Sequence, residues 1–356
     1  MMEQRVVLVT GVAGIIGKRV AEALMLKPGI HVIGLDSDPP EEIPKGLDFI
    51  QADIRNPLIV ELFKSEDIDT VCHLKFLESD RSSEATFDIN MMGTMKVFGA
   101  CEEAGVQKIV LMSSTAVYGA RPENSAFLSE DHPLSGSRTS GTIRDLVEIE
   151  AFCNDFIRQV PQVALTILRF ASILGPSIES PITRFLKAPV APVLLGFDPM
   201  MQVIHEDDVV GAIAHAVLND VPGVFNVADE GVLPLTKLVR LAGKFPVPVI
   251  HWFAYWSQDI IGKRSRYTPI ELDYLRYPWV GDLKKMREEM HFEPHYTSEE
   301  ALREFAGKQR VGRSMPESAA LEYDEVRLRD TIERRRRIRE RESAGADDQV
   351  EGENDE

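Results

Sequence analysis

Residues 6–24, VVLVTGVAGIIGKRVAEAL, place three glycines between an apolar run and an amphipathic one. Gly11, Gly14 and Gly17 have the spacing G-x-x-G-x-x-G. Glycine lets a strand turn tightly into a helix and lets a pyrophosphate approach bare backbone, while the helix N-terminus supplies N–H donors and a positive dipole. The stretch predicts a dinucleotide-binding turn, although glycines also occupy such turns for packing reasons alone.

Short apolar runs alternate with helical patterns along the first half of the chain. The runs are RVVLVTG (5–11), HVIGLD (31–36), LDFIQAD (47–53), TVCHL (70–74), KIVLMSS (108–114) and ALTILRF (164–170). Continuous apolar strands separated by helices indicate a parallel sheet that is covered on both faces. We therefore expect an α/β fold with a doubly wound parallel sheet, the Rossmann type.

The second apolar run ends in Asp36, 25 residues after Gly11. A carboxylate at this place accepts hydrogen bonds from both hydroxyls of an adenosine ribose and repels a 2′-phosphate. No arginine follows at 37–39. The sequence therefore favours NAD over NADP as cofactor. The alternative is that Asp36 is a solvated turn residue.

The organisation of the chain changes in its second half, where the regular alternation weakens. We expect residues 1–175 to form the NAD-binding Rossmann domain, with its sheet completed by about 200–228. Residues 176–306 are expected mostly to form a smaller C-terminal substrate-binding lobe. Residues 307–342 have the composition of a linker and a charged helix, and 343–356 that of a disordered acidic tail.

The formal net charge of −17 overstates the acidity of the folded part, because the last ten residues, Asp347–Glu356, carry six carboxylates and no base. A mildly acidic body argues against a nucleic-acid partner, which needs clustered Lys and Arg. The run Arg334–Arg337 leaves an RNA or membrane patch open as an alternative, but interleaved acids within 322–342 cancel most of its charge. This charged helix is also a candidate site for a protein partner.

The three cysteines, Cys72, Cys101 and Cys153, lie in apolar or helical segments, which suits reduced thiols in a cytoplasmic protein. The first residues enter a strand without a basic segment, so we expect no signal peptide. The most apolar later stretch, 247–256, is too short to span a bilayer. No cysteine pair or histidine group has the spacing of a metal site.

Over roughly residues 5–305 the chain resembles the NAD-dependent epimerase/dehydratase group of the extended short-chain dehydrogenase/reductases, which acts largely on nucleotide sugars. Six blocks in the family's order carry the resemblance. They are TGVAGIIG (10–17), ADI (52–54), VCHLKF (71–76), DINMMGTMKVFGAC (88–101), VLMSSTAVYG (110–119) and QVIHEDDVVGAI (202–213). The resemblance implies a small-molecule substrate of the nucleotide-sugar or a related hydroxylated class.

The resemblance also implies which residues hold the cofactor. These are Gly11, Ala13, Gly14, Ile15, Ile16, Gly17, Asp36, Asp53, Ile54, Leu74, Lys75, Asn90 and Ser113. Asp53 and Ile54 are expected at the adenine, and Ser114 matches a serine that hydrogen-bonds a substrate hydroxyl or carbonyl. Because the family commonly pairs through the helices that here span roughly 84–104 and 140–158, a homodimer is expected.

The family's acid/base dyad, a tyrosine and a lysine four residues apart, has no counterpart in the helix where it is expected. A free phenol has a pKa of about 10, and a nearby ammonium stabilises its ionised form. The segment TIRDLVEIE (142–150) replaces the pattern Y-x-x-x-K-x-E. Thr142 takes the place of the tyrosine and Leu146 that of the lysine, while Glu148 is retained.

No shift of register restores this dyad. Residues 109–186 contain no lysine and a single tyrosine, Tyr118, which lies only four residues after Ser114. An aliphatic alcohol such as that of Thr142 is too weak an acid to serve as the base. The helix is therefore expected without its usual proton-transfer chemistry.

Lys75 stands where the family has a small residue after the HL of its fourth strand. We hypothesise that its ammonium enters the site and interacts with the cofactor or with a substrate anion, supplying the charge lost at position 146. The alternative is a lysine that extends to solvent. His73 and His205 are expected to be mainly structural, with Asp207 and Asp208 as capping carboxylates of the next helix.

Two functions are left open by the sequence. The first is an NAD-binding enzyme of the family with an unusual mechanism, since loss of the general base lowers the rate by roughly two to four orders of magnitude. The second is a catalytically inactive NAD-binding sensor or scaffold that acts through protein–protein contacts.

Overall fold

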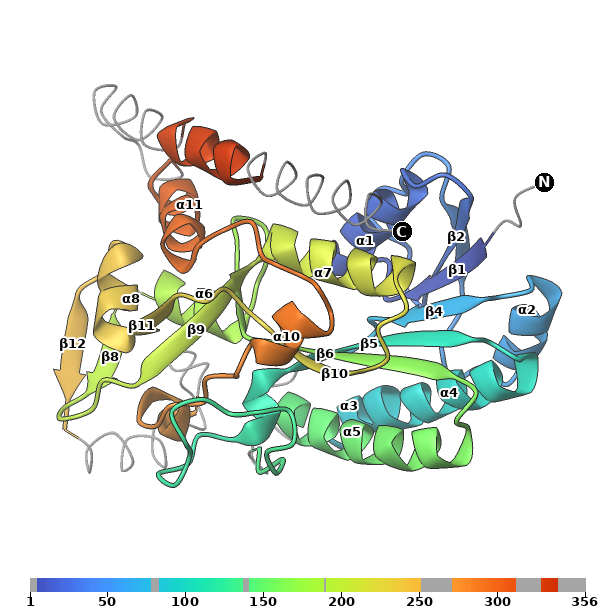
Figure 1. Cartoon of the computed structure of the whole chain (residues 1–356), viewed down its shortest axis with the longest axis horizontal. Coiled ribbons are helices and arrows are strands. Elements are labelled where there is room, and N and C mark those ends of the chain that lie inside the picture. The colour runs from blue at the N-terminus through green and yellow to red at the C-terminus, as the bar shows by residue number, and fades with distance from the viewer. Residues whose placement is uncertain are drawn as a thin grey trace, which may run out of the picture.

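A seven-stranded parallel sheet is the centre of the molecule (Figure 1). The computed structural model describes residues 5–77, 83–136, 141–188, 190–250, 271–311 and 328–338. The strand order is β10-β6-β5-β4-β1-β2-β3. The strands are β1 (Arg5–Thr10), β2 (Ile30–Asp36), β3 (Asp48–Gln51), β4 (Thr70–His73), β5 (Lys108–Ser114), β6 (Ala164–Phe170) and β10 (Gly223–Val227). All six runs predicted as strands lie in this sheet, which confirms the doubly wound Rossmann fold.

Helices cover both faces of the sheet because alternate residues of each strand point to opposite faces (Figure 1). On one face lie α1 (Ile15–Met25) and α7 (Glu206–Leu218), which pack on a core that includes Val7 and Val9. The other face carries α2 (Ile59–Ser65), α3 (Glu84–Phe87), the π-helix η1 (Asp88–Met92), α4 (Gly93–Ala104) and α5 (Gly141–Gln159). There the core includes Leu8 and Ile33 of the strands.

The segment expected to complete the sheet divides between two sheets. β10 pairs in parallel with β6 and forms the edge of the large sheet. β9 (Met200–His205) belongs instead to a three-stranded sheet with β7 (Ser172–Leu174) and β11 (Val232–Pro234). β7 and β9 are thus the strands by which the chain leaves and re-enters the Rossmann core.

A smaller lobe lies beside the carboxyl edge of the large sheet (Figure 1). A core of its own, which includes Phe185, Leu238 and Phe305, holds it together. The remaining elements are η2 (Thr115–Tyr118), α6 (Pro181–Lys187), β8 (Ala191–Leu194), α8 (Leu235–Leu241), β12 (Pro246–Val249), η3 (Leu272–Leu275), α10 (Lys284–Glu288) and α11 (Ser298–Val311). β8 and β12 form a two-stranded parallel sheet.

The charged segment near the end of the chain is helical over residues 328–338 and docks on α11. Arg337 donates to Glu300 at 2.7 and 2.8 Å, and Asp330 accepts from Arg303 at 3.0 Å. At least one arginine of the run 334–337 is therefore used in an ion pair within the chain. The predicted acidic tail, 343–356, lies outside the described residues. None of the helices in the described part of the chain has the length and apolar content needed to cross a bilayer.

Candidate functional site

The glycine-rich turn lies at the carboxyl end of β1, which pairs with β4 and β2 inside the large sheet. Gly11 has a φ of +78°, and a Cβ at this position would lie 2.8 Å from the backbone of both Leu74 and Lys75. A Cβ on Gly17 would lie 2.2 Å from the carbonyl oxygen of Gly11. Gly14 precedes α1 without a side-chain cap, so the first amides of this helix are available to an anion. The turn has the geometry of a phosphate cradle.

Other predicted cofactor residues surround this cradle. Ile15 is exposed and Ile16 is buried in the first turn of α1. The backbone amide of Leu74 donates to Thr10 Oγ1 at 3.1 Å, which fixes the chain directly after β4 against the cradle. The amide of Ala13 donates to Asp36 Oδ2 at 3.0 Å. The glycine turn and the end of β2 are therefore joined into one rigid unit.

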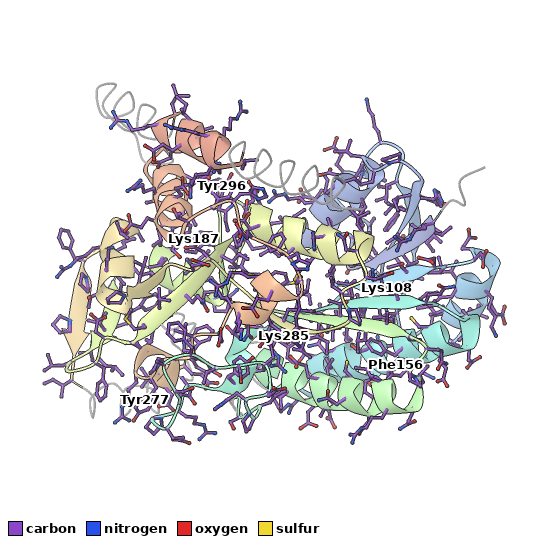
Figure 2. The ribbon with its side chains drawn as sticks, viewed as in Figure 1. Lys108, Phe156, Lys187, Tyr277, Lys285 and Tyr296 are labelled. Carbon is purple, nitrogen blue, oxygen red and sulfur yellow. The ribbon has the colours of Figure 1, made fainter. Side chains whose placement is uncertain are left out.

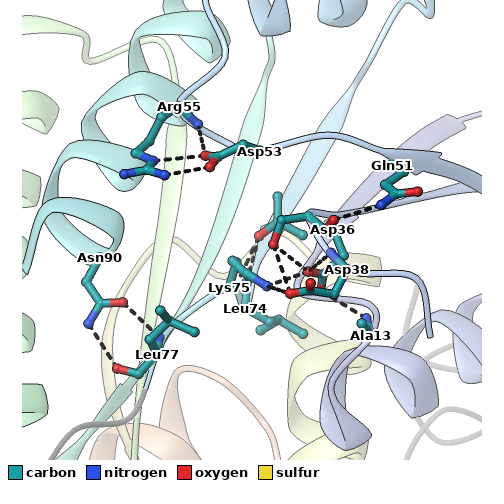
Figure 3. A network of polar contacts seen from close by, with 12 residues as sticks. Ala13, Asp36, Asp38, Gln51, Asp53, Arg55, Leu74, Lys75, Leu77 and Asn90 are labelled. Carbon is teal, nitrogen blue, oxygen red and sulfur yellow. Dashed lines mark hydrogen bonds and ion pairs between the residues drawn. The ribbon is translucent and has the colours of Figure 1, made fainter. Parts of the chain in front are cut away.

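Asp36, at the end of β2, lies beside the glycine turn and is only 1% exposed. Its Oδ1 accepts from the amide of Asp38 at 3.3 Å and forms an ion pair with Lys75 Nζ (Figure 3). The Lys75 side chain thus does not extend to solvent, and the partner that the structure gives it is the carboxylate expected to bind the ribose.

Asp53 and Ile54, expected at the adenine, follow β3. The carboxylate of Asp53 accepts from Arg55 through the backbone amide at 2.8 Å and the guanidinium at 2.7 and 3.0 Å (Figure 3). The hydrogen bond from the Arg55 side chain lowers the pKa of Asp53. Ile54 is buried against Gly93, where an added Cβ would lie 2.3 Å from its Cδ1. This turn is held by contacts within the chain.

Asn90 lies in the π-helix η1, a distortion that often accompanies functional sites. Its amide oxygen accepts from the amide of Leu77 at 2.8 Å, and its Nδ2 donates to the Leu77 carbonyl at 3.1 Å and to Asp145 at 3.0 Å (Figure 3 shows the contacts with Leu77). Arg144 also binds Asp145, at 2.9 Å. The sequence did not reveal this buried contact between η1 and α5.

The two serines at the end of β5 have different roles in the structure. Ser113 is buried, and its hydroxyl donates to Glu150 at 2.5 Å. Ser114 is half-buried, and its Oγ accepts from the amide of Ala116 at 3.2 Å as the N-cap of η2. Among the described residues no acceptor takes the hydroxyl proton of Ser114, which could therefore be donated to a ligand oxygen.

Helix α5 carries the positions aligned with the dyad. Thr142 is half-buried, and Leu146 is 7% exposed. Glu148, which was singled out by the motif, is exposed, whereas Glu150 two residues later is buried. The acid that matters for packing is therefore Glu150.

Glu150 anchors a buried polar network beneath the site. Arg169 donates to Glu150 Oε2 at 2.6 and 3.0 Å and to Oε1 at 3.2 Å. Arg169 also donates to the Tyr118 hydroxyl at 2.8 Å, which itself donates to Asn226 at 2.7 Å. Burial raises the pKa of Tyr118 to about 12. The sequence did carry a sign of this network, namely Arg169 inside the apolar run ALTILRF (164–170). A buried arginine needs a buried acid as its partner.

His73 and His205, both expected to be mainly structural, each form hydrogen bonds within the chain. His73 lies between the hydroxyls of Thr10 (2.8 Å) and Thr94 (3.0 Å), and burial lowers its pKa to about 3. His205 Nδ1 accepts from the amide of Asp207 at 3.2 Å. The N-cap of α7 is therefore His205 itself rather than one of the two aspartates that open the helix.

The smaller lobe contributes aromatic and cationic groups near the end of β5. The Tyr274 hydroxyl donates to the carbonyl of Ala116 at 2.8 Å. The guanidinium of Arg276 lies 4.7 Å from the centroids of both the Phe197 and Tyr277 rings (Figure 2 labels Tyr277). The Nε of Arg276 is buried without a hydrogen-bond acceptor among the described residues.

A separate hollow lies at the opposite, amino edge of the sheet, lined by residues that include Arg5, Asp69 and Lys108. Lys108 Nζ donates to Asp220 at 3.0 Å and to the carbonyl of Asn219, so it serves to fix the chain after α7. In the part of the chain that the structure describes, no cluster of acids, histidines and cysteines has the arrangement of a metal site.

Comparison with known proteins gives a consistent family. A model of the NAD dependent epimerase/dehydratase family matches residues 7–228. Uncharacterized proteins of Mycobacterium bovis and Mycobacterium tuberculosis are each 33% identical over 313 residues, which cover 85% of this chain and 83% of theirs.

Solved structures of similar fold include a UDP-glucose 4-epimerase of Thermotoga maritima with UDP-glucose (TM-score 0.67, 22% identity, 87% of this chain and 100% of that chain). A dTDP-glucose 4,6-dehydratase of Bacillus anthracis in complex with NAD has a TM-score of 0.67 at 17% identity, over 87% of this chain and 97% of that chain. The chain described here belongs to the NAD dependent epimerase/dehydratase family.

Proposed function

We propose that this chain holds NAD at the carboxyl edge of its large sheet and binds a nucleotide sugar, or a related hydroxylated ligand, without the family's acid/base dyad. The phosphate cradle carries the proposal, because side chains at Gly11 and Gly17 would collide with backbone at 2.8 and 2.2 Å. A turn packed this closely brings the α1 amides within reach of a pyrophosphate.

The residues around the cradle fit the cofactor. The first-turn amides of α1 would hold the pyrophosphate, Asp36 the adenosine ribose, and the turn at Asp53 and Ile54 the adenine. The chemistry that bound NAD would supply is a hydride acceptor for a carbon that bears a hydroxyl group. Asn90 acts on this site by fixing Leu77, which follows the end of β4.

Helix α5 has no phenol–ammonium pair to carry out the proton transfer that normally accompanies hydride transfer. We propose that Thr142 and Leu146 occupy the two positions, and neither side chain forms a stable anion or a cation near neutral pH. Tyr118 does not replace the missing phenol, because it is buried, bound to Asn226 and Arg169, and has a pKa raised to about 12. Ser114 would orient a ligand oxygen rather than take its proton.

For the ligand we propose an anionic, hydroxylated molecule that reaches Ser114 from the side of the smaller lobe. Arg276 has no carboxylate partner among the described residues and is held by two aromatic rings. Tyr277 packs in a cluster with Ala116 and Ile143, next to Ser114 and Thr142. A guanidinium at this place suits a diphosphate. The fold neighbour from Thermotoga maritima is solved with UDP-glucose.

The experiment is to mix NAD+ and the protein with a panel of UDP- and GDP-sugars and to follow absorbance in the band of reduced nicotinamide. We expect NAD+ to bind and its reduction to be slow, by roughly two to four orders of magnitude relative to a dyad-containing relative. Arg276→Met should weaken the binding of UDP and leave NAD+ binding unchanged. Reduction at the relative's rate would contradict the loss of the dyad.

A second candidate is an NAD-binding sensor or scaffold, and contacts of the C-terminal helix favour it. The guanidinium of Arg334 lies 3.8 Å from the centroid of the Tyr296 ring, and the Tyr296 hydroxyl donates to Asp207 at 2.8 Å (Figure 2 labels Tyr296). Asp207 in turn binds Arg19 of α1, the helix that begins at the cradle. NAD+ binding with no reduction by any sugar of the panel would favour this function.

We also propose a homodimer formed through α4 and α5, as is common in the family. Met92, the last residue of η1, and Met95 in α4 are 39% and 38% exposed and would be covered by such a contact. A cytoplasmic location remains a proposal, supported by three free and buried cysteine thiols. A sedimentation experiment that finds only monomer at micromolar concentration would contradict the dimer.

A further inference from the structure

Lys75 reaches the nucleotide site from a strand that is not the neighbour of β2. The order β4-β1-β2 places β1 between Lys75 and Asp36. The Lys75 side chain therefore crosses the carboxyl end of β1, where the glycine turn begins, to form its ion pair with Asp36 (Figure 3). No basic residue at 37–39 supplies this cation, which comes instead from 39 residues further along the chain.

The ion pair covers the carboxylate. Asp36 is 1% exposed and the side chain of Lys75 is 13% exposed. One carboxylate oxygen accepts from Ala13, and the other binds Lys75 and accepts from the amide of Asp38. The hydroxyls of an adenosine ribose can bond to Asp36 only after Lys75 has moved.

The ion pair between Lys75 and Asp36 has different consequences for the binding of NAD+ and of NADP+. For NAD+, displacing Lys75 separates the ammonium from Asp36, leaves it only the exposed carboxylate of Asp38, now 4.0 Å away, and supplies no new anion on the ribose. For NADP+, the 2′-phosphate is itself an anion at the same place, so the ammonium can move from Asp36 to the phosphate and keep a partner. The carboxylate that would repel this phosphate also has its charge balanced by Lys75.

We propose that Lys75 sets the nucleotide specificity of this chain, by competing with the ribose of NAD+ for Asp36 and by donating hydrogen bonds to the 2′-phosphate of NADP+. The chain then binds NADP+ as well as NAD+, in contrast to the selection of NAD that Asp36 alone would give. This inference rests on the proposed position of Asp36 at the adenosine ribose. It goes beyond that proposal in assigning a role to Lys75.

The test is calorimetric titration of the full chain with NAD+ and with NADP+, which needs no substrate and no turnover. In the wild type, the two dissociation constants should differ by less than about tenfold. In Lys75→Met, NAD+ should bind at least as tightly as in the wild type, and NADP+ should bind more weakly. The ratio of the NADP+ to the NAD+ constant should rise by about tenfold or more.

Two further variants control for charge and position. Lys64→Met on α2 removes the same charge from a side chain whose ion pair, with Glu103 at 3.7 Å, is exposed, and it should leave the ratio unchanged. Lys75→Arg keeps the cation and should keep the ratio near that of the wild type. Thermal unfolding of each variant shows that the fold is intact.

The inference is overturned if Lys75→Met leaves the ratio unchanged, or if the wild type discriminates against NADP+ by about a hundredfold or more. The second result stands without any variant. If NAD+ binds tightly and either of these two results is found, the proposed role of Lys75 is wrong but the proposed cofactor site is not affected. Absence of binding of both nucleotides removes the proposed cofactor site and this inference together.

Discussion

Glu148 and Glu150 lie two residues apart on α5, and only the second is buried. Glu150 accepts hydrogen bonds from Ser113 and Arg169, so it joins β5, β6 and α5 beneath the end of the large sheet. A buried arginine that loses its carboxylate is left as an uncompensated charge, which is far more costly than loss of an exposed acid.

Glu150→Gln should therefore lower the free energy of unfolding by about 3–5 kcal/mol. Glu148→Gln is the matched control, since it makes the same chemical change on the same helix, and it should change stability by no more than about 0.5 kcal/mol. Urea unfolding of the two variants measures both values. Equal losses in the two variants would mean that the network around Glu150 contributes nothing specific.

His73 should make stability depend on pH. Burial lowers its pKa to about 3 in the folded state, and the ordinary value of about 6.5 applies in the unfolded state. Above about pH 6.5 both states hold the neutral ring. As the pH falls below this value, only the unfolded state takes up a proton, so the stabilisation is lost by up to about 1.4 kcal/mol per pH unit down to the folded pKa.

The measurement is the free energy of unfolding at pH 7 and pH 5 for the wild type and for His73→Asn. Between these conditions the wild type should lose about 2 kcal/mol more than the variant. The variant is expected to be less stable at both pH values, because Thr10 and Thr94 lose their partner. Equal losses of unfolding free energy in the wild type and in the variant would contradict a neutral His73 ring in the folded state.

Some of the individual site residues could be predicted from the sequence and others could not. The glycines, Asp36 and the serines are local motifs, and the structure places them together at the end of β1, β2 and β5. The partner of Lys75 was not predictable, because it depends on which strands lie side by side and not on spacing along the chain. Arg276 was missed for the same reason, since its contact with the Phe197 ring depends on how the smaller lobe folds.

At the scale of elements, α1 and its glycine turn behave as one packed unit. Gly17 is inside the helix, yet a Cβ there would lie 2.2 Å from the Gly11 carbonyl oxygen. Gly99 is also inside a helix, α4, and a Cβ there would meet no heavy atom within 4 Å. The same substitution should thus have opposite effects in the two helices.

Gly17→Ala should lower the free energy of unfolding by about 1–3 kcal/mol, because the turn has to shift to admit the methyl group. It should also weaken NAD+ binding by about tenfold or more, because the cradle is displaced. Gly99→Ala should raise stability by up to about 1 kcal/mol through its better helix propensity. Unfolding and nucleotide titrations check both; wild-type NAD+ affinity in Gly17→Ala would contradict the assignment of the cradle.

The strands were the most predictable elements, because a parallel strand buried on both faces is a continuous apolar run. The division between β9 and β10 was not predictable, since both are short apolar runs and only pairing decides which sheet receives each. The π-helix η1 around Asn90 gave no signal in the sequence. Its form reflects tertiary contacts with Leu77 and Asp145.

At the scale of the whole molecule, the two lobes and the C-terminal helix are joined by specific polar contacts. Tyr274 of the smaller lobe donates to Ala116 at the end of the large sheet, and residues 328–338 contact α11 through Arg337 and Asp330. Tyr296 and Asp207 continue these contacts to Arg19 on α1. The contacts of residues 328–338 thus continue to α1, the helix that follows the glycine turn.

The central claim is that this family member keeps a pocket for a nicotinamide dinucleotide while the usual proton-transfer residues of α5 are absent. Calorimetric titration of the intact protein with NAD+ tests it most directly. We expect saturable heat that fits one site per chain. No heat with NAD+ or NADH, from protein that shows a cooperative unfolding transition, would contradict the claim.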